Sequence, residues 1–114
     1  MILTARDKDC QYIWFAHATG ARQEGISDEF VDALRDKKPL PKLPTEEQIV
    51  VDYATELFAT NRVSPATFQS AIDHFGAMLL TELTTMMGYY SMLALNVNAF
   101  EVDRPEGGEA PLVV

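Results

Sequence analysis

The stretch AMLLTELTTMMGYYSMLALNVNAF, residues 77–100, decides the fold class. It is apolar, contains no proline, and would be long enough as a helix to cross a bilayer. Glu82 and Asn96 interrupt its apolar character, and threonine and serine hydroxyls add further polar groups. We therefore predict a long central helix that supplies much of the core, and no membrane span. Glu82, buried in such a helix, would need an ion-pair partner.

Start and stop signals divide the preceding residues into further helices. Four are predicted, at residues 9–22, 27–36, 45–60 and 64–76. Their starts are marked by N-cap residues at Asp9, Ser27 and Ser64 and by a capping box formed by Thr45 and Gln48. Gly76 should end the last of them. No segment alternates with period two, so the sequence predicts an all-α bundle of about five helices.

The prolines and the acidic end of the chain set the domain organisation. Pro39, Pro41 and Pro44 form a stiff connector, because proline lacks the amide that a helix needs. Residues 1–103 should be one helical domain, and residues 104–114 an acidic flexible tail.

Composition restricts the partners and the compartment. The 114 residues are 47% hydrophobic and 23% charged, with a formal net charge of −8, which disfavours nucleic acid and anionic membranes. One cysteine cannot form an internal disulfide, and the first residues have too short an apolar run for a secretory signal. We expect a cytoplasmic protein.

The candidate chemistry lies in CQYIWFAH, residues 10–17. His17 can give and take a proton near neutral pH, although it could equally be an interior histidine satisfied by one hydrogen bond. Cys10 would occupy the first turn of the helix as a reactive thiol, or act as a small buried filler. Along one helix the two lie about 10 Å apart, and Ile13 occupies the position that neighbours His17.

An ordered series of motifs resembles the carboxymuconolactone decarboxylase family, which includes the alkylhydroperoxidase D-like proteins. The series covers residues 1 to about 103 and consists of Cys10-x-x-x-Trp14-x-x-His17, the helix from Ser27, the proline connector, Thr45-Glu46-Glu47, Ser64-Pro65-Ala66-Thr67-Phe68, Gly88-Tyr89-Tyr90 and Asn98-Ala99-Phe100. The resemblance implies the family's all-helical fold, without its N-terminal helices, and assembly into trimers or hexamers.

The redox branch of that family carries Cys-x-x-Cys-x-x-x-His, preceded by a glutamate. Cys10 and His17 match the first cysteine and the histidine, but Ile13 replaces the second cysteine, and the glutamate would precede Met1. The dithiol reaction is therefore not expected.

Three hypotheses follow. The chain is a cofactor-free enzyme that acts on a small organic acid or lactone through His17, or a peroxiredoxin-type antioxidant protein that uses Cys10, or a noncatalytic oligomeric relative. We predict His17 and Cys10 as catalytic residues and Arg6, Trp14 and Tyr89 as substrate-binding residues, with Arg22 as an alternative cation. No metal or other cofactor is expected, since His74 lacks a partner at metal-ligand spacing.

Overall fold

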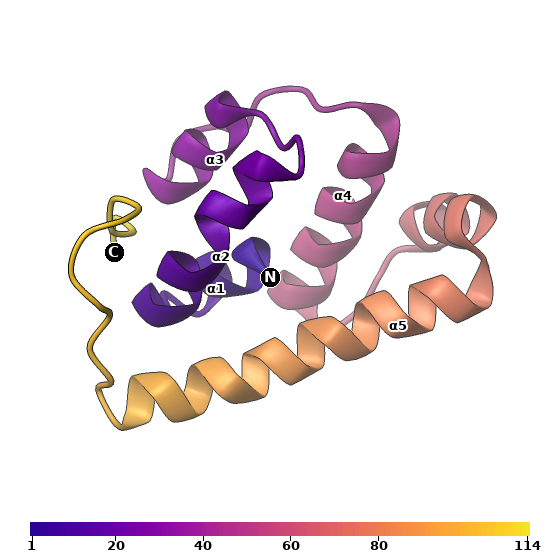
Figure 1. Cartoon of the computed structure of the whole chain (residues 1–114). Coiled ribbons are helices and arrows are strands. Elements are labelled where there is room, and N and C mark those ends of the chain that lie inside the picture. The colour runs from indigo at the N-terminus through magenta and orange to yellow at the C-terminus, as the bar shows by residue number, and fades with distance from the viewer. The chain divides into compact units, whose positions relative to one another are not determined.

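The computed structural model describes all of residues 1–114 and contains helices only, which confirms the predicted all-α class (Figure 1). The elements are α1 (Ile2–Asp7), α2 (Gln11–Gln23), α3 (Asp28–Arg35), α4 (Thr45–Thr60) and α5 (Pro65–Ala99). They divide between two units. The first unit consists of Met1–Pro41 and Gly88–Val114, and the second unit of Lys42–Met87.

Several local signals predicted from the sequence are confirmed. The Ser27 hydroxyl accepts a hydrogen bond from the Phe30 amide at 3.2 Å, and the Ser64 hydroxyl accepts one from the Thr67 amide at 3.3 Å. Gly76 has φ 76° and ψ 167°, so it breaks α5 into two helical segments at the predicted residue. The predicted end of α4 at residue 60 is observed, and Asn61 follows it in the left-handed conformation. These features depend on neighbours within a few residues, which the sequence displays directly.

Two predicted caps are wrong. Asp9 is not the N-cap of α2, because it lies in the left-handed region at φ 48° and its carboxylate pairs with Arg6. Cys10 takes the cap position instead. At α4 the N-cap is Pro44, and no side chain caps the helix. Gln48 reaches back to the Leu43 amide at 3.3 Å, so the predicted capping box with Thr45 does not form.

The core of the first unit lies mainly between its short helices. Thr4, Cys10, Trp14 and Val31 are the largest side chains that are almost completely buried. Phe30 and Leu34 of α3 join them. From α5 only Ala94 adds a fully buried side chain here, so the long helix supplies less of the core than we predicted.

The second unit is held by α4 and the first part of α5. Tyr53 and Ala54 are buried, and the Tyr53 hydroxyl lies 2.7 Å from the Thr84 hydroxyl. Since the Thr84 hydroxyl donates its own proton to the Leu80 carbonyl, Tyr53 must donate to Thr84. Glu82 is exposed, so it is not the buried carboxylate that we predicted.

The C-terminal segment, expected to be flexible, lies against α2 and α3 (Figure 1). Leu112 is only 4% exposed, and the Val113 amide donates to the Arg35 carbonyl at 3.0 Å. None of the helices has both the length and the apolar character that crossing a membrane requires.

Candidate functional site

His17 lies on α2, and its partly buried imidazole packs against an aromatic pair from α5. The rings of His17 and Tyr90 meet edge to face with centroids 5.2 Å apart, and Tyr90 meets Tyr89 in the same way at 5.5 Å. Partial burial lowers the pKa of His17 below its usual value of 6.5, and the positive amino group of Met1 lowers it further. The imidazole is therefore neutral at pH 7.

Cys10 is a free thiol in the interior. It is 0% exposed. We predicted Cys10 in the first turn of the helix, and it is the N-cap residue, one position before that turn. A peroxide-reducing cysteine must meet its oxidant and its reductant as an exposed thiolate. Full burial does not satisfy that requirement and agrees with the alternative of a small buried filler.

Arg6 already has protein partners. Its guanidinium donates to the Arg35 carbonyl at 3.0 Å and to the Leu34 carbonyl at 3.4 Å, and it pairs with the Asp9 carboxylate. These contacts connect α1 to the end of α3 and satisfy the carbonyls that a helix C-terminus leaves unpaired. Arg6 therefore offers no unpaired charge to a substrate in this arrangement.

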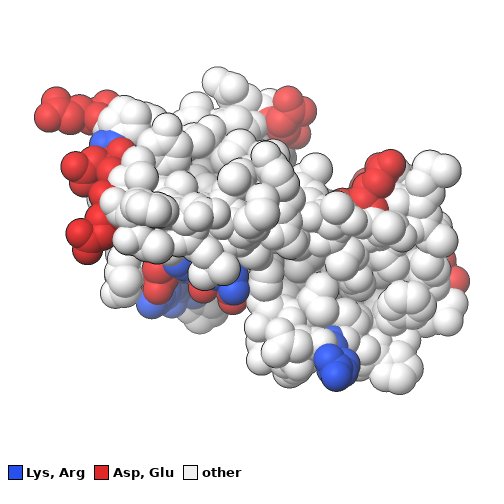
Figure 2. All heavy atoms as spheres, turned by 90° about the horizontal axis from the view of Figure 1, so that it is seen from below, with Lys and Arg blue, Asp and Glu red and all other residues white.

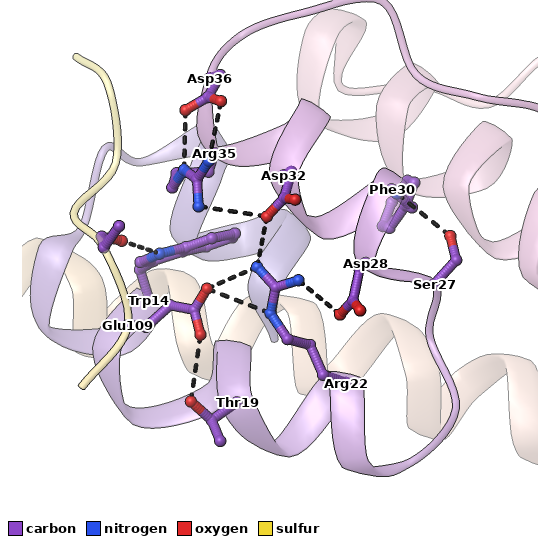
Figure 3. Close-up of polar contacts among 11 residues, drawn as sticks. Trp14, Thr19, Arg22, Ser27, Asp28, Phe30, Asp32, Arg35, Asp36 and Glu109 are labelled. Carbon is purple, nitrogen blue, oxygen red and sulfur yellow. Dashed lines mark hydrogen bonds and ion pairs between the residues drawn. The ribbon is translucent and has the colours of Figure 1, made fainter.

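Arg22 is the centre of a carboxylate network (Figure 3). Its guanidinium contacts Glu109 at 2.6 Å, Asp32 at 2.6 Å and Asp28 at 2.7 Å. Hydrogen bonding to Glu109 is the main cause that raises the pKa of Arg22, and the bonds to Asp32 and Asp28 act in the same direction. Arg35 shares Asp32 and also pairs with Asp36, so four carboxylates surround two cations. This site therefore carries net negative charge and would repel an anionic substrate.

The other two predicted substrate-binding residues differ in access. Trp14 is 0% exposed, and its indole nitrogen donates to the Ala110 carbonyl at 3.0 Å, so its role is internal. Tyr89 is 52% exposed and meets Tyr90 edge to face. Of the predicted site residues, the structure brings Tyr89 close to His17 through Tyr90.

Sequence reasoning missed Gln11 and Glu109. The Gln11 amide donates to the Leu112 carbonyl at 2.9 Å and accepts from the Leu112 amide at 2.8 Å. Glu109 accepts hydrogen bonds from Arg22 at 2.6 Å and from Thr19 at 3.2 Å (Figure 3). Both pairings join residues far apart in sequence. The closely spaced Gly107 and Gly108 were the one local signal of a defined turn here.

No group of three or more histidine, cysteine, aspartate or glutamate side chains is arranged to hold a metal ion. Comparison with known proteins matched no family model, no curated protein and no solved structure.

Proposed function

We propose that the chain is a carboxymuconolactone decarboxylase-like protein in which His17 transfers a proton to a small organic acid or lactone, without a cofactor. The observation that supports this proposal is the pairing of a partly exposed imidazole of lowered pKa with Tyr90. Cys10 is sealed, and Arg6 and Arg22 bind protein oxygens. His17 is thus the predicted catalytic group that remains accessible, and its pKa below 6.5 makes its protonated form available in mildly acidic solution.

In the proposed reaction, the bond between the ring carbon and the carboxylate breaks and carbon dioxide leaves. The electron pair of that bond delocalises into the conjugated lactone, and the carbon then takes a proton from protonated His17. The imidazole regains its proton from water. Because only the protonated fraction donates, the rate should fall as the pH rises through a pKa that lies below 6.5.

The two histidines provide a matched test. His17→Gln should reduce carbon dioxide release from carboxymuconolactone by about 100-fold or more, the range of a general acid. His74→Gln, which changes an exposed histidine beside Phe75, should leave it unchanged. Equal rates in the two variants, or no release by the unaltered protein, would contradict the proposal.

A second candidate is a noncatalytic protein that assembles with further copies of itself as a trimer or hexamer. It is favoured by exposed apolar side chains in the C-terminal part of the first unit: Tyr89 52%, Met92 51%, Leu95 62% and Phe100 80%. Figure 2 shows broad areas of uncharged side chains on the face that it draws. Exposed apolar surface of this kind is typical of contact sites between chains.

Leu95→Glu tests this candidate by measurement of the molar mass in solution. An assembly through these side chains should dissociate to smaller species, because a carboxylate would be buried at the contact. Glu101→Gln, which removes an exposed charge in the same unit, is the control. A monomeric unaltered protein at high concentration would overturn the candidate.

A further inference from the structure

The residues of α2 that contact the C-terminal segment lie along one side of the helix. Gln11, Phe15, Thr19 and Arg22 follow one another at spacings of three or four residues, and Trp14 lies beside Phe15. Each contacts a part of residues 104–112. This spacing places side chains on one helical face. That face is therefore lined by groups that contact the C-terminal segment.

The contacts follow the segment in order. Gln11 binds both the amide and the carbonyl of Leu112, and Trp14 binds the Ala110 carbonyl. Thr19 and Arg22, further along α2, bind the carboxylate of Glu109. Residues 109–112 thus run antiparallel to α2, and side-chain hydrogen bonds hold the main chain of Ala110 and Leu112.

Two side chains of the segment give the contact its selectivity. Leu112 is 4% exposed, and the Glu109 side chain is 11% exposed against Arg22. Ala110 and Pro111 between them are exposed. This face therefore selects a leucine three residues after an acidic residue. The side chains of the two residues between them are not restricted, because they are exposed.

The approach to the segment also has a specific shape. Gly108 has φ 68°, and a Cβ atom at this position would lie 2.6 Å from the Phe15 ring. Arg104 covers the same ring at 5.8 Å and donates to the Gly107 and Glu109 carbonyls. This turn brings the segment onto α2 without adding a helix or a strand. The segment is consequently attached through hydrogen bonds and one buried leucine, a set of contacts that can open locally.

We propose that this face of α2 is a peptide-recognition surface for a segment with the pattern Glu-x-x-Leu, and that the C-terminal segment occupies it as an intramolecular, exchangeable ligand. The occupant in trans is the same segment of a second copy, because an identical sequence makes identical contacts. A short tether gives the attached segment a local concentration in the millimolar range. Exchange therefore requires release of the attached segment or a high concentration of the second one.

Trp14 reports on the exchange, since it is the single tryptophan of the chain and contacts the segment directly. In the full-length Leu112→Glu variant, the segment should leave α2 and the Trp14 emission should shift to the red. A synthetic peptide of residues 103–114 should reverse the shift with saturation, whereas the same peptide with Glu109→Lys should bind at least about tenfold more weakly. No reversal, or equal reversal by both peptides, would overturn the proposal.

The unaltered protein provides a second measurement if Leu112→Glu does not fold. The Leu112 and Val113 amides donate to Gln11 and Arg35, so they should be protected from hydrogen exchange. Millimolar unlabelled peptide should accelerate their exchange several-fold, because it displaces the attached segment. Exchange rates that do not depend on the peptide would show a permanently fixed segment and would reject the proposal.

Discussion

The two units differ in what holds their segments together. In the first unit, charged and polar groups join parts of the chain that are far apart in sequence, as in the pairs Arg22–Glu109 and Gln11–Leu112. In the second unit, the polar contacts between α4 and the beginning of α5 include the Tyr53–Thr84 hydroxyl pair and the hydrogen bonds from Ser64 and Thr67 to Glu56. Large apolar side chains such as Met78 remain exposed there. The way in which the segments of the first unit pack therefore depends on hydrogen-bond geometry between distant residues. In the second unit it depends on the packing of buried apolar side chains.

The largest effect should come from the core of the first unit. Trp14→Ala removes a fully buried side chain together with its hydrogen bond to Ala110, and should lower the free energy of unfolding by about 3–5 kcal/mol. Urea unfolding followed by circular dichroism measures this change. Met78→Ala, at a side chain that is 77% exposed, should cost no more than about 0.5 kcal/mol. Similar losses of unfolding free energy in Trp14→Ala and Met78→Ala would contradict the contrast between the buried side chain and the exposed one.

The charged network should rank second. Arg22→Gln leaves the mostly buried Glu109 carboxylate without its cation and should lower the free energy of unfolding by about 1.5–3 kcal/mol. Arg62→Gln is the matched control in the second unit, where the exposed guanidinium contacts only the adjacent Asn61 carbonyl. We expect no measurable loss there. If added salt lowers the free energy of unfolding of the unaltered protein and of Arg22→Gln by equal amounts, the charged network does not stabilise the first unit.

A smaller effect is expected at the polar contact of the second unit. Tyr53→Phe keeps the buried ring and removes the hydroxyl that donates to Thr84, which should lower the free energy of unfolding by about 0.5–1.5 kcal/mol. Tyr12→Phe removes a hydroxyl from a more exposed ring and serves as the comparison. A double-mutant cycle with Thr84→Val would attribute the loss to this pair. Additive losses in that cycle would argue against a direct coupling.

The smallest effect concerns pH. Hydrogen bonds from Thr67 and then from Ser64 lower the pKa of Glu56 below its usual 4.5. A lowered carboxyl pKa stabilises the folded chain above pH 4.5, and this contribution disappears as the pH falls through the folded-state pKa. Glu56→Gln should therefore melt at a lower temperature near pH 7, and its deficit should shrink towards pH 3. Glu82→Gln is the charge-matched control in the same unit, and a deficit of Glu56→Gln that stays constant with pH would contradict the assignment.

The sequence alone predicted those features that neighbouring residues determine. The hydroxyls of Ser27 and Ser64 can reach amides three residues further on whatever the rest of the chain does, and Gly76 can adopt a positive φ that other residues avoid. The all-helical class follows from such signals together with the absence of period-two patterns. The failure at Asp9 also has a local cause, since Arg6 three residues earlier competes for its carboxylate.

Only the tertiary structure decided which charged groups remain available and where the C-terminal segment lies. The partners of Arg22 include a residue 87 positions away, and Gln11 binds one 101 positions away. Pairings over such separations depend on how the helices pack, which no local spacing encodes. The same packing buried Cys10 and left His17 partly exposed beside Tyr90, because burial is a property of the assembled core and not of the residue.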